Sequence, residues 1–169
     1  MPNQALLDGL TLVYPFSFTE MPGSRGPTNR PERRPHGDFP ATAGPPAVLL
    51  VEDDGQLAEM YRLRLERANI DVTVAADGDE ALKLASTLAY DLVLMDLGLP
   101  KRGGLEVIRM LRSEPATAGI PMVVLSNYSE PGMVKEGLDL GVLAYLVKAD
   151  TTPSRLVAAV LDWLRPATS

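Results

Sequence analysis

The chain has 169 residues, room for one ordinary domain, and its 46% hydrophobic and 22% charged content is typical of a water-soluble globular protein. It contains no cysteine, which excludes disulfides and thiolate metal sites, and eighteen acidic against twelve basic side chains in residues 47–169 argue against direct nucleic-acid binding. No apolar run approaches the ~20 residues that a membrane-spanning helix needs, so we expect a cytoplasmic protein that does not cross a membrane.

Residues 1–46 are predicted to be a disordered leader. From Pro22 to Pro46 the chain is dense in proline, glycine and arginine and has neither a helical nor a strand period. The mildly apolar stretch Leu6–Phe18 does not fit a signal peptide, because Asp8 and Gly9 interrupt it and no Lys or Arg precedes it. We therefore expect the leader to be dispensable for the folding of the remainder.

From residue 47 onward, predicted strands and helices alternate. Short apolar or β-branched runs predict five strands, at residues 47–51, 71–75, 92–95, 120–125 and 144–147. Apolar residues at helical spacing predict five helices, at residues 56–68, 80–88, 104–112, 131–140 and 153–164. Because such alternation forms right-handed crossovers, we predict one three-layer α/β domain over residues 47–166, with a parallel sheet covered on both faces.

Polar side chains follow four of the five predicted strands. Glu52 and Asp53 come after the first strand, Asp96 after the third, Ser126 ends the fourth and Lys148 follows the fifth. Because the carboxyl ends of parallel strands share one edge of a sheet, we expect these side chains to converge. Three carboxylates at close range repel one another unless a cation offsets their charge, and Mg²⁺ suits carboxylate oxygens. The sequence therefore predicts a magnesium site at this edge.

The same edge suits a phosphoryl group. The Lys148 ammonium could neutralise phosphoryl oxygens, and the Ser126 hydroxyl could donate a hydrogen bond to one of them. The only histidine, His36, lies in the predicted leader. Asp96 is therefore the remaining nucleophile candidate, since a carboxylate can take up a phosphoryl group as an aspartyl-phosphate.

Each of these residues also has a plainer interpretation. Asp96 could simply open a turn, and Glu52 and Asp53 could cap the helix that follows them. Ser126 could be an ordinary turn hydroxyl and Lys148 a solvated cation. Their joint placement at strand ends favours the metal and phosphoryl interpretation.

Five short motifs, taken in their order along the chain, resemble those of a known family. They are Leu50–Asp54, Asp91–Pro100, Gly104–Glu106, Val124–Ser126 and Tyr145–Lys148. Asp96 and Ser126 are 30 positions apart, and Ser126 and Lys148 are 22 apart. Through these motifs and intervals the chain from about Ala47 to Arg165 resembles the receiver domain of bacterial two-component response regulators.

The resemblance implies a fold, a reaction and a metal site. The fold would be a doubly wound, flavodoxin-like (βα)5 domain with strand order 2-1-3-4-5. Asp96 would accept a phosphoryl group from the phosphohistidine of a histidine kinase or a phosphotransfer protein. Glu52 and Asp53 would hold Mg²⁺ together with Asp96 and the backbone carbonyl of Gly98.

The resemblance also implies a switch. Lys148 would contact one phosphoryl oxygen, Ser126 would move to bond another, and Tyr145 would swing inward as Ser126 moves. A new charge of about −1.5 to −2 with three acceptor oxygens can rearrange a hydroxyl-bearing loop in this way. Tyr145 could equally be a packing residue, and Trp163 on the last helix could serve packing or partner binding.

Three positions depart from the commonest family pattern. Gly103 stands where an Asp often precedes the helix-starting glycine, which predicts a looser helix start. Asn127 follows Ser126 where Ala or Gly is usual, and adds polar bulk beside the phosphoryl site. Ala149 follows Lys148 where Pro is common; the family's peptide bond there is often cis, and for a non-proline residue that costs ~2.5–4 kcal/mol, so either this cost is borne or the loop differs.

The leading hypothesis is a single-domain response regulator in a two-component or phosphorelay system. It would be a phosphoacceptor signalling domain that assists its own phosphorylation and dephosphorylation, not an enzyme with a separate substrate. Its output would pass to an unknown partner protein or to the next carrier in a phosphorelay, with dimerisation through the last two helices as one form of response.

Two other functions are considered. The chain could be a phosphorylation-independent interaction module whose acidic pocket is a relic. A Mg²⁺-dependent phosphatase with an aspartyl-phosphate intermediate is less favoured, because Gly98 leaves no general acid two residues after Asp96.

Overall fold

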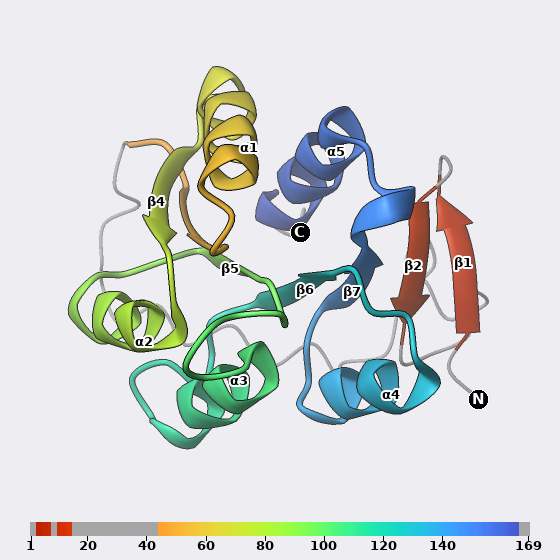
Figure 1. The fold of residues 1–169 in the computed structure, drawn as a ribbon. Coiled ribbons are helices and arrows are strands. Elements are labelled where there is room, and N and C mark those ends of the chain that lie inside the picture. Colours follow the sequence, from red (N-terminus) through yellow and green to blue (C-terminus); the bar gives the residue numbers. More distant parts are fainter. Residues whose placement is uncertain (1–2, 8–9, 15–43, 166–169) are drawn as a thin grey trace.

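Five parallel strands form the centre of the fold in the computed structural model, which describes residues 3–7, 10–14 and 44–165 (Figure 1). The strands are β3 (Ala47–Val51), β4 (Asp71–Ala75), β5 (Leu92–Met95), β6 (Met122–Ser126) and β7 (Ala144–Val147). They lie side by side in the order β4-β3-β5-β6-β7. This is the predicted order 2-1-3-4-5, which is therefore confirmed.

Helices cover both faces of this sheet. They are α1 (Gly55–Arg67), α2 (Gly78–Thr87), α3 (Gly104–Ser113), α4 (Pro131–Asp139) and α5 (Pro153–Leu164), and a 3-10 turn, η2 (Lys148–Asp150), precedes the last. In Figure 1, α1 and α5 lie on one side of the sheet, and α2, α3 and α4 on the other. The predicted three-layer α/β architecture is confirmed. Among the described residues no helix is both long enough and apolar enough to traverse a bilayer.

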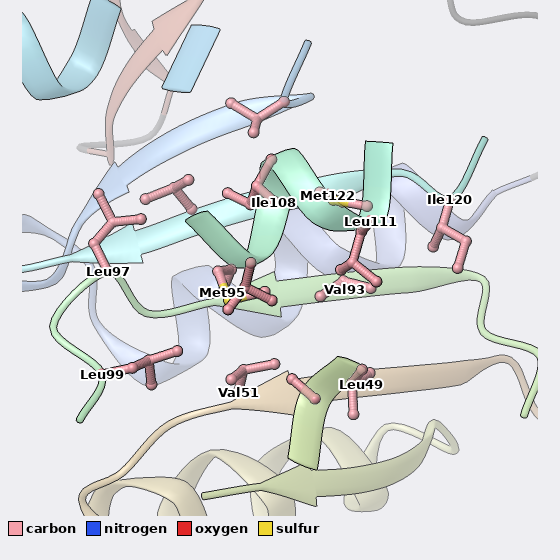
Figure 2. Close-up of a cluster of buried hydrophobic side chains, with 14 of the residues drawn as sticks. Leu49, Val51, Val93, Met95, Leu97, Leu99, Ile108, Leu111, Ile120 and Met122 are labelled. Carbon is pink, nitrogen blue, oxygen red and sulfur yellow. The ribbon is translucent and has the colours of Figure 1, made fainter. Parts of the chain in front are cut away.

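Two separate hydrophobic clusters hold the layers together, one on each face of the sheet. Successive strand residues point to opposite faces, so Leu49 and Val51 of β3 join the cluster beneath α2, α3 and α4, whereas Val48 and Leu50 join the cluster beneath α1 and α5. Figure 2 shows the first cluster, in which Ile108 of α3 packs among the strand residues. Burial on both faces explains why the strands are continuous apolar runs.

The helices begin in two different ways. Side chains cap α1, α2 and α5, where Asp54, Asp77 and Thr152 accept hydrogen bonds from backbone N–H groups of the first turn. No side chain does this at α3 or α4, whose first flanking residues are Gly103 and Glu130. The two uncapped helices are the ones that follow β5 and β6.

Two additional strands lie in the predicted leader. Strands β1 (Asn3–Leu7) and β2 (Leu10–Tyr14) form an antiparallel hairpin, and β2 pairs antiparallel with β7 opposite Leu146 and Tyr145. The sheet therefore has seven strands, and the expectation of a leader without strands differs from the structure at these ten residues. The physical reason is tertiary: β7 is an edge strand of the parallel sheet and offers unpaired main-chain groups to an apolar segment.

Residues 1–2, 8–9 and 15–43 of the predicted leader lie outside the described residues, as does residue 166 at the predicted end of the domain. That the leader is dispensable stays a prediction.

Candidate functional site

The carboxyl ends of β3, β5 and β7 bring three of the predicted residues into direct contact. Lys148 Nζ lies 2.6 Å from Glu52 Oε2 and 3.3 Å from Asp96 Oδ2. The Asp96 backbone N–H donates to Val51 O at 3.0 Å, which fixes the loop after β5 against the end of β3. Residues far apart in the sequence thus meet at one sheet edge, as the topology requires.

These three charges are nearly out of contact with water. Glu52 is 3% exposed and Asp96 7% exposed. Burial raises the pKa of Glu52, although the hydrogen bond from Lys148 opposes this effect. For Lys148 burial lowers the pKa, but the bond to Glu52 and the nearby Asp96 charge outweigh it, so the pKa is raised. Lys148 is therefore a permanent cation between two carboxylates.

A group of three carboxylates fits a divalent cation. One oxygen from each of Glu52, Asp53 and Asp96 lies within 4.8 Å of the others. Glu52 and Asp96 are buried, whereas Asp53 is exposed. All the donors are oxygen atoms, the ligand type that Mg²⁺ prefers, and an open side leaves room for water ligands. The residues present therefore fit the predicted metal.

Gly98 lies beside this group. Its backbone N–H donates to Asp96 Oδ1 at 3.2 Å, and Gly98 lines the same pocket as the three carboxylates and Lys148. A metal bond from the Gly98 carbonyl stays a prediction.

The loop that carries Asp96 is held by a close approach of α3. A Cβ atom at Gly104 would lie only 2.2 Å from the Asp96 carbonyl oxygen, so only glycine allows this contact. Further along the loop, Lys101 has a positive φ of 64° and lies 2.7 Å from Asp77 Oδ2. The neighbouring Arg102 is paired with Asp79 of α2 at 3.0 Å. The loop is therefore fastened to α2 by two ion pairs.

Ser126 and Tyr145 meet at the backbone of a residue that the sequence analysis did not select. The Ser126 hydroxyl accepts a hydrogen bond from the Tyr128 N–H at 3.1 Å. The Tyr145 hydroxyl donates to the Tyr128 carbonyl at 2.7 Å, and its ring is completely buried. Tyr145 thus lies inward in this structure, and Tyr128 joins it to Ser126.

Tyr128 also reaches the pocket with its side chain. Its ring is 45% exposed and lines the pocket together with Asn127. A Cβ at Gly98 would lie 3.8 Å from Tyr128 Cε2, so the ring stands close to that glycine. Its position two residues after Ser126 was the signal that could have revealed it.

The loop after Lys148 differs from the proline-containing form. No peptide bond among the described residues is cis, so the Lys148–Ala149 bond is trans, and the chain continues as the turn η2. The Thr151 hydroxyl donates to Val147 O at 2.8 Å and closes this turn. Lys148 reaches both carboxylates from this loop.

Known proteins resemble this chain in sequence and in fold. Residues 48–161 match the family model described as the response regulator receiver domain. The DNA-binding response regulator MtrA of Mycolicibacterium paratuberculosis is 39% identical over 118 residues, which cover 70% of this chain and 51% of that protein. The chain thus spans about half the length of that relative.

Solved structures show the same likeness. The Francisella response regulator 1452 receiver domain is 32% identical with a TM-score of 0.65, and the match covers 70% of this chain and 96% of that one. The receiver domain of the sensor histidine kinase PA1611 from Pseudomonas aeruginosa PAO1 is 27% identical with a TM-score of 0.65, covering 72% and 98%. That structure holds a magnesium ion in its active-site cleft.

Proposed function

The chain belongs to the response regulator receiver domain family, a family of signalling domains, and on that premise we propose that Asp96 accepts a phosphoryl group from a phosphohistidine. The donor would be a histidine kinase or a phosphotransfer protein. The observation that carries the proposal is the contact of Lys148 Nζ, 3.3 Å from Asp96 Oδ2, within a pocket lined by three further carboxylates, Glu52, Asp53 and Asp54.

The reaction is a transfer of one phosphoryl group between side chains. An Asp96 carboxylate oxygen attacks the phosphorus atom, an O–P bond forms as the N–P bond breaks, and the imidazole nitrogen leaves with the bonding electrons and takes up a proton. Lys148, already charged, pairs with an oxygen of the transferred group. Glu52, Asp53 and Asp96 would hold Mg²⁺, which when bound offsets the negative charge of the phosphoryl oxygens.

The phosphoryl group would be sensed through Ser126. Its hydroxyl accepts a hydrogen bond from the Tyr128 N–H and so keeps its own hydrogen available for a phosphoryl oxygen. A shift of Ser126 would reach Tyr145 through the two hydrogen bonds made by the N–H and the carbonyl of Tyr128. We propose that this relay changes the surface around α4, β7 and α5 that a partner contacts.

The output is proposed to pass through protein contacts in the cytoplasm. The acidic balance of residues 47–169 disfavours direct contact with nucleic-acid phosphates. The name of the MtrA relative records DNA binding, but this chain matches only about half of that protein.

Phosphorylation can be tested with acetyl phosphate and Mg²⁺. We expect a mass increase of about 80 Da, the mass of one phosphoryl group, in the wild type and none in Asp96→Asn. The control Asp162→Asn removes an exposed carboxylate on α5, away from the Asp96 loop, and should be labelled normally. A wild type without the adduct, or an adduct that survives Asp96→Asn, would refute the proposal and favour a phosphorylation-independent interaction module.

A further inference from the structure

Helix α4 has a glycine where it crosses the ring of Tyr145. Gly137 is buried, and a Cβ atom placed there would lie 3.3 Å from Tyr145 Cδ2 and 3.7 Å from Cε2. The same atom would lie 3.9 Å from Leu105 Cδ2 of α3. The space above the ring is therefore limited by the main chain of α4 itself.

A glycine at this point is unfavourable for the helix alone. Within a helix interior glycine is less stable than alanine, because it loses more conformational freedom on folding. Gly137 is the seventh of nine residues in α4 and has no positive φ that would require glycine. What distinguishes the position is the aromatic ring packed against it.

The ring position has consequences for the site. Tyr145 is fully buried, and its hydroxyl supplies the hydrogen bond to the Tyr128 carbonyl. If the ring turned outward, that carbonyl would lose this donor, and the link from Ser126 to β7 would be broken at Tyr128. The packing of α4 on the ring thus acts on the residue next to the phosphoryl pocket.

We propose that Gly137 is a positioning residue for Tyr145: the missing side chain lets the ring lie beneath α4, and side-chain volume at position 137 sets how far the ring stays inward. This inference concerns the resting position of the ring and stands on packing. Its signalling consequence, a change in how firmly the Ser126–Tyr128–Tyr145 relay is held, rests on the proposed function.

The expected response is graded with volume. A single methyl group at 3.3 Å requires the ring to yield by a few tenths of an ångström, whereas a leucine side chain would extend into the space that the ring occupies. The same helix offers a matched control in Gly132, where an added Cβ atom would meet nothing within 4 Å. Substitutions there change helix propensity without touching Tyr145.

The test is ¹⁹F NMR of the full chain labelled with 3-fluorotyrosine, with Tyr145→Phe to assign the signal. We expect Gly137→Leu to raise the ratio of outward to inward ring by at least about tenfold, Gly137→Ala to raise it less, and Gly132→Leu to leave it unchanged. A Tyr145 signal that stays in its wild-type position in Gly137→Leu, or that moves equally in Gly132→Leu, would overturn the inference.

Two further measurements keep the outcome decisive. If circular dichroism shows that Gly137→Leu does not fold, Gly137→Ala decides: a Tyr145 signal identical to that of Gly132→Ala overturns the inference. Labelling by acetyl phosphate is measured on the same samples. A ring that moves while the wild type takes no phosphoryl group would refute the proposed function alone, and a ring that stays while labelling proceeds would refute this inference alone.

Discussion

The three helices that begin with a side-chain cap differ from the two that do not, and the difference follows the site. Helices α1, α2 and α5 are capped by the side chains of Asp54, Asp77 and Thr152, whereas α3 and α4 start without a side-chain cap. The uncapped helices follow the strands that lead to Asp96, the proposed phosphoacceptor, and to Ser126. First-turn N–H groups at these two starts have no side-chain acceptor, and at α3 the Gly104 N–H donates instead to Leu97 O at 3.2 Å.

The uncapped helices are instead fastened at their other ends. Arg112 near the end of α3 donates hydrogen bonds to the carbonyls of Ala118, Ile120, Leu140 and Gly141, at 2.6, 2.8, 3.1 and 3.0 Å. Leu140 and Gly141 directly follow α4, so one guanidinium ties the ends of both helices together. Helices that are tied at their C-terminal ends and have no side-chain cap at their starts are suited to a small rotation that starts at the site.

The largest effect is expected where backbone contact replaces a cap. In Gly104→Ala the new methyl group would lie 2.2 Å from the Asp96 carbonyl oxygen, so the backbone must move. We expect the free energy of unfolding, measured in urea, to fall by about 3 kcal/mol or more, and labelling of Asp96 to slow. Gly103→Ala meets no atom within 4 Å and should change stability by less than about 0.5 kcal/mol. Similar losses in both variants would show that the contact with Asp96 is unimportant.

The next largest effect should come from the shared anchor. Arg112→Met keeps the apolar stem but leaves four carbonyls without their donor, and we expect a loss of about 2–3 kcal/mol in the free energy of unfolding. The exposed Arg109 of the same helix, paired with Glu136, provides the control: Arg109→Met should cost less than about 1 kcal/mol. Hydrogen exchange at Leu140 and Gly141 should accelerate in the first variant only. Unchanged hydrogen exchange at Leu140 and Gly141 would show that Arg112 does not anchor the end of α4.

A new cap at α4 should reduce the difference between the helix starts. Glu130→Asp places a good capping side chain at the first flanking residue of α4, and we expect it to stabilise the domain by about 0.5–1 kcal/mol. The reciprocal variant, Thr152→Ala at α5, should destabilise by a similar amount, because Thr152 Oγ1 now accepts from the Arg155 N–H at 3.3 Å. Thermal unfolding of the two variants measures both changes in stability. A Glu130→Asp variant without added stability would mean that the first-turn N–H groups of α4 already have hydrogen-bond acceptors.

The smallest expected effect concerns pH. The hydrogen bond from Lys101, and then the bond from the Glu80 N–H, hold the pKa of Asp77 below its ordinary value of 3.8. Its contribution to stability is present above that value and is lost as pH falls through the lower pKa of the folded state. The stability difference between the wild type and Asp77→Asn, which keeps the cap, should therefore stay constant above about pH 5 and shrink as the pH falls below it. A difference that grows on acidification would contradict this assignment.

The sequence was most informative where a local pattern reports tertiary placement. Strands buried on both faces are continuous apolar runs, and residues at their carboxyl ends meet at one edge whatever their separation in the chain. This is why Glu52, Asp96 and Lys148 could be selected and why they meet in the structure.

Other features depend on contacts that no local pattern reports. The strands in residues 3–14 pair with an edge formed over 130 residues later. Tyr128 contributes its backbone as well as its ring, and any residue type except proline could supply that N–H and carbonyl. The roles of Gly137 and Arg112 follow from what lies beside them in space, an aromatic ring and four carbonyls, and neither residue type predicts such a neighbour.

The hairpin on β7 also changes where another molecule could extend the sheet. Because β2 occupies the side of β7, the outermost strand there is β1, two places removed from the strand that carries Tyr145. Polymerisation by main-chain pairing on that flank would add its strands to β1. Growth of such a fibre and a change at the proposed Ser126–Tyr128–Tyr145 relay would therefore take place on different strands.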